Sequence, residues 1–380
     1  MARKRLVDFV RQRLARQLAG QGAPPDEVRI VERIFDPDSL TIGFARRFAT
    51  YKRPNLLLHD PDRLLRILTN RQRPVQLILA GKAHPQDAAG QEMIRQWIEF
   101  IRNTPARTQA VFLSDYDMRV TEHLVQGVDL WLNTPRRPWE ACGTSGMKIL
   151  SNGGLNLSEL DGWWAEASAP DVGWAIGDGQ EHDEDPAWDA VEAGQLYTLL
   201  EDKVIPEFYR RDESGVPAEW ASKMCESMAR LTPAFSSNRA VRQYTKDCYL
   251  PGAEGFLARS ADNGKLGIDI LNWRRLVADH WPRLRFGDLK VESGEGRHSF
   301  YVQAYLDELD PEAVNVELYA EGQGVQVMKR GELLTGAMNA YGYTTTVSSD
   351  RPASDFTPRI VPRHPAAAAP LEAPQILWYR

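Results

Sequence analysis

The sequence predicts an α/β protein in which a doubly wound parallel sheet is followed by a small antiparallel β-domain. Between residues 39 and 154, short and nearly continuous apolar runs alternate with stretches of helical periodicity. Such runs are typical of parallel strands that helices cover on both faces. From about residue 286 apolar and polar residues alternate instead, as in VNVELYA at 314–320. This period of two indicates antiparallel strands with one buried face.

The elements are expected in a regular order along the chain. A basic amphipathic helix opens it, with leucine or valine at positions 6, 10, 14 and 18; a mitochondrial targeting peptide has the same character but is expected to be richer in serine. Strands are predicted at 39–44, 75–81, 110–116 and 128–133, with helices at 55–68, 93–101 and 121–125 between them. Residues 185–258 are predicted to be helical, and a polar break at 259–267 precedes the β-domain.

Composition narrows the class of protein. The 46 Lys+Arg and 52 Asp+Glu give a net charge of −6, which argues against a protein that mainly coats nucleic acid. No apolar run approaches the roughly 18 residues of a membrane helix. The three cysteines, Cys142, Cys225 and Cys248, are too few and too unevenly spaced for a disulfide framework or a zinc site. We therefore expect a cytoplasmic protein without bound metal, membrane contact or nucleic-acid partner.

The stretch WEACGTSGMKILSNGG at 139–154 has the densest set of candidate functional residues. It follows a predicted strand and opens a helix, so the backbone N–H groups from Gly143 to Gly146 face the space over the strand ends, where an anion is favoured. Thr144 and Ser145 add hydroxyl donors, and Lys148 lies one turn into the helix. The alternative is an ordinary glycine-rich turn with Lys148 in solvent.

A second cluster, ARRFATYKR, follows the first predicted strand and contains Arg46, Arg47, Lys52 and Arg53. Arginine offers phosphate a bidentate fork and lysine a point charge, although a charge run can also be a solvated surface. A third, weaker candidate is the Asp-Tyr-Asp sequence at 115–117. Because the carboxyl ends of parallel strands share one edge of a sheet, the three groups should converge on one crevice that suits two neighbouring phosphates.

These motifs resemble those of the α-glucan (glycogen/starch/maltodextrin) phosphorylases. EACGTSGMK is similar to the cofactor signature of that family and ARRFATYKR to its phosphate-binding stretch, while GKAHP (81–85), FLSDYD (112–117) and NGGLNLSELDG (152–162) follow in the same order. The resemblance implies that residues 39–258 are the Rossmann-like, cofactor-binding C-terminal lobe of a two-lobed glycosyltransferase-B enzyme. It also implies that 1–38 is an N-terminal helical segment and 259–380 a linker with a β-rich C-terminal domain.

The resemblance further implies a reaction and a set of residues. Pyridoxal 5′-phosphate would be held by Lys148 as a Schiff base, and inorganic phosphate would cleave terminal α-1,4-glucosyl units of a glucan to α-glucose 1-phosphate. The cofactor phosphate would act as proton donor and acceptor through the substrate phosphate. The implied catalytic residues are Lys52, Arg47 and Lys148. The other implied contacts are Arg46, Lys52, Tyr116, Thr144 and Ser145 to the cofactor, and Arg47, Glu140, Cys142 and Gly143 to the substrate.

Some residues depart from the pattern of the family. Cys142 stands where animal enzymes have serine, Ser145–Gly146 replaces a Gly-Asn pair, and Asp117 stands where arginine is common. The chain also resembles only the second of two lobes, so we expect a separate N-terminal lobe, or a second copy of the chain, as a partner.

Two other interpretations remain open. A nucleotide-sugar-dependent glycosyltransferase of the same fold often has a second glutamate eight positions after the first. Here Lys148 stands eight positions after Glu140, and an ammonium cannot accept a hydrogen bond from a ribose hydroxyl. The other interpretation is that the isolated chain is inactive and serves as a cofactor-binding or glucan-binding module.

Overall fold

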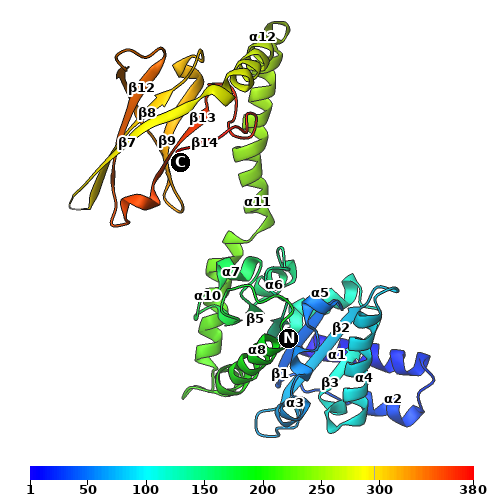
Figure 1. The fold of residues 1–380 in the computed structure, drawn as a ribbon. Coiled ribbons are helices and arrows are strands. Elements are labelled where there is room, and N and C mark those ends of the chain that lie inside the picture. The colour runs from blue at the N-terminus through cyan, green and yellow to red at the C-terminus, as the bar shows by residue number, and fades with distance from the viewer. Residues whose placement is uncertain (295) are drawn as a thin grey trace. The chain divides into compact units, whose positions relative to one another are not determined.

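The computed structural model describes residues 1–294 and 296–380, which form two compact units, Met1–Val241 and Arg242–Arg380. The sequence placed the start of the β-rich domain and its linker at residue 259. The N-terminal segment 1–38 belongs to the first unit. The predicted class is confirmed, because a six-stranded parallel sheet is followed by antiparallel sheets (Figure 1).

The sheet of the first unit has the strand order β3-β2-β1-β4-β5-β6, and every pairing is parallel. Its strands are β1 (Leu40–Arg47), β2 (Val75–Lys82), β3 (Ala110–Leu113), β4 (Leu130–Asn133), β5 (Leu155–Glu159) and β6 (Gly173–Ile176). The four predicted strands are confirmed, although the third ends at Leu113 and not at residue 116. The strands β5 and β6 were not predicted.

Helices cover both faces of this sheet and bury several apolar clusters. They are α1 (Ala2–Gly20), α2 (Pro25–Val31), α3 (Pro61–Leu68), α4 (Ala88–Asn103), α5 (Met118–Gly127), α6 (Thr144–Leu150), α7 (Trp163–Ala167), α8 (Pro186–Leu199), α9 (Ile205–Tyr209) and α10 (Ala218–Ala234). Within β2, Leu77 and Leu79 enter the core with α3, α4 and α8, whereas Ile78 and Ala80 enter the core with α1 and α5. The N-terminal helix α1, predicted as amphipathic, thus packs its apolar side into the core.

The second unit combines a long helical segment with a β-sandwich. Its helices are α11 (Ser237–Tyr244), which begins in the first unit, and α12 (Leu250–His280); residues 261–264 of α12 are non-helical, where the polar break was predicted. The two sheets have the orders β10-β9-β13-β14 and β11-β12-β8-β7. Their strands are β7 (Arg285–Gly294), β8 (Arg297–Tyr305), β9 (Val314–Ala320), β10 (Gly324–Val327), β11 (Lys329–Leu333), β12 (Ala340–Ser348), β13 (Thr357–Pro362) and β14 (Leu377–Trp378).

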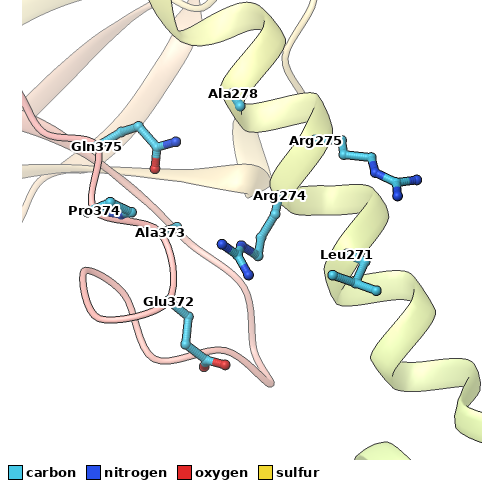
Figure 2. Close-up of a pocket in the computed structure, with 8 residues that line it drawn as sticks. All are labelled: Leu271, Arg274, Arg275, Ala278, Glu372, Ala373, Pro374 and Gln375. Carbon is cyan, nitrogen blue, oxygen red and sulfur yellow. The ribbon is translucent and has the colours of Figure 1, made fainter.

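The core of the second unit confirms the predicted alternation in β9. Val314, Val316, Leu318 and Ala320 are all buried in one cluster to which α12 contributes Trp273. A pocket of about 320 Å³ lies between α12 and the C-terminal segment 372–375 (Figure 2). None of the helices in the described ranges is long and apolar enough to cross a membrane.

Candidate active site

The candidate residues lie at the point where the strand order of the sheet reverses. The strands β1 and β4 are neighbours, with β2 and β3 on one side and β5 and β6 on the other. Ligands of open α/β sheets bind at the carboxyl ends of the strands at such a point. Arg46 and Arg47 end β1, and the loop that contains Glu140 joins β4 to α6. The predicted groups after β1 and β4 are therefore adjacent. Tyr116 follows β3 at the edge of the sheet and interacts electrostatically with Arg46.

Two cations converge on one buried carboxylate in this crevice. A carboxylate oxygen of Glu140 accepts hydrogen bonds from Arg46 Nη2 at 2.8 Å and from Lys52 Nζ at 2.5 Å. The three side chains are only 10–11% exposed. Burial raises the pKa of Glu140, but Arg46 and Lys52 lower it by more, so the carboxylate is ionised. The cluster therefore has an excess of positive charge.

Within this positively charged cluster, one N–H donor of Arg46 is also left unused by the described residues. Its Nη1 atom is buried and makes no hydrogen bond within the described part of the chain. A buried N–H group without an acceptor costs about 1–3 kcal/mol, more for a charged group. Burial also lowers the pKa of Arg46, an effect that Glu140 offsets only in part. An anion placed beside Nη1 would relieve both costs, so the residues present fit a phosphate group.

An aromatic wall flanks the cations on the exposed side. Arg47 is exposed and donates to the Tyr51 hydroxyl at 3.1 Å, and Lys52 Nζ lies 4.7 Å from the centre of the Tyr51 ring. Burial raises the pKa of Tyr51, but Arg47 and Lys52 lower it by more. The Tyr51 ring lies 6.1 Å from that of Trp139, which is 58% exposed. The sequence analysis did not single out either ring, although both lie inside its motifs.

The segment after β5 holds the loop between β4 and α6 in place through hydrogen bonds. One oxygen of Asp161 accepts from the backbone N–H of Glu140 at 2.8 Å, and the backbone N–H of Trp163 donates to the carbonyl of Cys142 at 2.8 Å. Gly143 begins α6 with a φ of 91°, in the left-handed region that favours glycine. Asp161 lies in the NGGLNLSELDG motif, so its position in that motif was the available signal for its role.

Gly146 offers a direct test of this packing. A Cβ at this position would lie 2.7 Å from Asn156 Oδ1 and 2.9 Å from the Trp163 ring, whereas a Cβ at Gly194 in α8 would meet nothing within 4 Å. Gly146→Ala is expected to lower the free energy of unfolding by about 1–3 kcal/mol. Gly194→Ala is the control and should raise it by about 0.5–1 kcal/mol, because alanine restricts the unfolded chain. Equal effects of the two changes in urea unfolding would contradict this account.

The remaining predicted residues are open to solvent or bonded within the protein. Thr144, Lys148 and Cys142 are exposed, and the ammonium of Lys148 has no ion pair in the described ranges. The Ser145 hydroxyl accepts from the indole of Trp131 at 3.2 Å. Helix α6 has seven residues.

The fold and this crevice define an α/β protein with a buried cluster of cations, a candidate anion site, at the reversal of its strand order. Residues 29–170 match the carbohydrate phosphorylase family. The chain belongs to the α-glucan phosphorylase family, as the sequence analysis predicted. It is 36% identical over 392 residues to the glycogen phosphorylase of Mycobacterium tuberculosis (strain CDC 1551 / Oshkosh), covering 97% of this chain and 44% of that protein.

Two further relatives extend the comparison. The maltodextrin phosphorylase of Thermococcus litoralis is 37% identical over 340 residues, which cover 87% of this chain and 40% of the relative. The glycogen phosphorylase of Aquifex aeolicus is 42% identical over 248 residues, which cover 65% of this chain and 35% of that protein. The chain thus spans less than half the length of each of these relatives.

Proposed function

We propose that this chain is the cofactor- and phosphate-binding lobe of an α-1,4-glucan phosphorylase, a retaining glycosyltransferase of the glycosyltransferase-B type. With the rest of that enzyme it would cleave terminal α-1,4-glucosyl units with inorganic phosphate to give α-glucose 1-phosphate in the cytoplasm. The observation that supports this most directly is the cluster of Arg46 and Lys52 on Glu140, with one guanidinium nitrogen left free. The names of the relatives, glycogen and maltodextrin phosphorylase, support the substrate class.

Lys148 would hold pyridoxal 5′-phosphate, and Arg46, Lys52, Thr144, Ser145 and Tyr116 would surround its phosphate. When bound, that phosphate would supply a proton donor and acceptor for the substrate phosphate. Two unit charges about 4 Å apart repel by about 4 kcal/mol at an effective dielectric of about 20. Lys52 and Arg46 are placed to offset this repulsion, and they are already buried, so they need little reorganisation.

Glu140, Cys142 and Gly143 would bind the glucosyl unit. The Glu140 carboxylate is ionised and can accept from sugar hydroxyls. The backbone N–H groups of Cys142 and Gly143 have no hydrogen-bond acceptor among the described residues, so they are available as donors. Because these donors belong to the backbone, cysteine at 142 would preserve them. Arg47, exposed beside Tyr51, would contact the substrate phosphate.

Lys148 provides the first test. The chain is mixed with pyridoxal 5′-phosphate, reduced with borohydride and digested, and the labelled peptide is identified by mass spectrometry. We expect the label on Lys148, with loss of stoichiometric labelling in Lys148→Ala. Lys82→Ala is the matched control, because Lys82 is also exposed and ends the neighbouring strand β2. A well-folded chain that carries no label, or that carries it equally on several lysines, would overturn the assignment of the cofactor.

Activity is expected only together with the part of the relatives that this chain does not match. That part is more than half of each relative. In the second unit, Tyr249, Phe256 and Leu257 are 65–70% exposed, so they offer apolar surface that a partner could cover. We propose that a separate N-terminal lobe, or a second copy of the chain, is the partner.

A further inference from the structure

The side chain next to Lys52 in sequence is the most extensively bonded one near the site. Arg53 is 6% exposed and has the left-handed backbone conformation, with a φ of 43°. Its guanidinium donates to two backbone carbonyls and three carboxylates, and a guanidinium has five N–H donors in all. The acceptors are Thr134 O (3.1 Å), Pro135 O (2.8 Å), Asp189 (2.9 Å), Glu159 (3.0 Å) and Glu192.

These contacts join the turn 51–53 to three other parts of the first unit. Thr134 and Pro135 belong to the loop after β4, Glu159 ends β5, and α8 supplies the other two carboxylates. The Thr134 hydroxyl lies 3.2 Å from the carbonyl of Lys52 and 3.1 Å from that of Arg53. The backbone of Lys52 is therefore tied to the same loop that leads to Glu140.

A second arginine, Arg136, also bonds to the turn 51–53 and to Asp189. The backbone N–H of Arg136 donates to the carbonyl of Tyr51 at 2.6 Å, and its side chain donates to Asp189 at 2.7 Å. The turn 51–53 is thus bonded on both sides to residues 134–136. The position of the Lys52 ammonium depends on this turn, because the turn supplies both the Lys52 side chain that reaches Glu140 and the Tyr51 ring 4.7 Å from that ammonium.

We propose that Arg53 is a positioning residue, which fixes the turn 51–53 so that the Lys52 ammonium reaches Glu140 and the anion site. The use of Lys52 toward phosphate rests on the proposed function. The placement of Lys52 does not, so it is tested in the ligand-free chain. Removal of Arg53 releases the turn from α8 and from the loop after β4, and Lys52 then becomes accessible to solvent.

The test is the rate at which Lys52 reacts with acetic anhydride, followed by mass spectrometry in the full chain. In the unsubstituted protein Lys52 is protected, because it is 10% exposed and paired. We expect Arg53→Gln to raise the rate at Lys52 at least tenfold. Lys223 is the internal reference: it is 11% exposed and bonded to Pro170 in the same unit, so it reports general loosening. Its rate should not change.

The controls separate positioning from a general loss of stability. Arg63→Gln removes a guanidinium that also binds a carboxylate, Glu201, but away from this turn, and it should leave Lys52 protected. If Arg53→Gln does not fold, Asp189→Asn removes one acceptor and should give a smaller increase at Lys52. Protection of Lys52 in the folded variants, or equal increases at Lys52 and Lys223, would overturn the inference. Failure to bind pyridoxal 5′-phosphate would contradict only the proposed function.

Discussion

Glu140→Gln is expected to bind inorganic phosphate more tightly than the unsubstituted chain. The carboxylate now neutralises Arg46 and Lys52, at 2.8 and 2.5 Å. Phosphate that binds beside Nη1 of Arg46 comes close to this carboxylate, and two such anions about 4 Å apart repel by about 4 kcal/mol at an effective dielectric of about 20. The amide removes that competition and leaves both cations free. A gain of about tenfold in affinity corresponds to only about 1.4 kcal/mol.

The same change should reduce phosphorolysis in the enzyme assembled with its other lobe. If Glu140 binds glucosyl hydroxyls, its loss should lower the rate about 10²-fold, because the sugar then loses charge-assisted hydrogen bonds. Lys52→Met should also lower the rate but should weaken phosphate binding. Isothermal titration with inorganic phosphate and initial rates with maltodextrin measure the two effects.

A surface carboxylate serves as the control for Glu140. Glu201 pairs with Arg63 at 2.6 Å but is about one-third exposed, so Glu201→Gln should alter neither phosphate affinity nor rate. Glu140→Gln should also lower thermal stability, because two buried cations lose their partner, and added phosphate should restore it. Weaker phosphate binding by Glu140→Gln would show that the carboxylate does not compete with the anion.

The sequence predicted the four strands of the sheet between residues 39 and 133 but not β5 and β6. The strand β5, LNLSE, escaped because Asn156, Ser158 and Glu159 are polar and yet buried. Their hydrogen bonds explain why burial is possible: Asn156 donates to the carbonyl of Gly146, and Ser158 accepts from Asn133. Those partners come from other elements, so a hydrophobic pattern cannot reveal them.

In the candidate site, too, residues close together in sequence could be predicted, whereas contacts between distant residues could not. The cations of the site lie within eight residues, 46–53, so a single motif contains them. Glu140 lies 88 residues from Lys52 and 94 from Arg46, and no periodicity links them. Arg46 and Lys52 could be named from their charge and their place after a strand, whereas Glu140 could be named only through a resemblance, and the contact between them was not predicted. The carboxylates around Arg53 are 106–139 residues away in sequence, and their contacts with Arg53 were not predicted.

Glu159→Gln should alter the dependence of stability on pH. Burial and Glu192 raise the pKa of Glu159 to about 8, against an ordinary value of 4.5, although Arg53 opposes them. The folded chain therefore holds a proton that the unfolded chain has released. The contribution of Glu159 to stability is therefore complete below about pH 4.5 and is lost as the pH rises to about 8, by at most about 1.4 kcal/mol per pH unit. The amide has no proton to lose, so this decline should disappear.

The interval from pH 7 to 8 isolates this group. Burial also raises the pKa of Asp129, to about 7. Asp129 therefore causes a similar loss of stability with rising pH, but most of that loss occurs below pH 7. Urea unfolding of the first unit, followed by tryptophan fluorescence at pH 6, 7 and 8, measures the slope. Glu201→Gln should keep the slope of the unsubstituted chain. If Glu159→Gln keeps it too, the proton is not on Glu159, and Glu192 in the same cluster becomes the group to replace, since the two carboxyls titrate together.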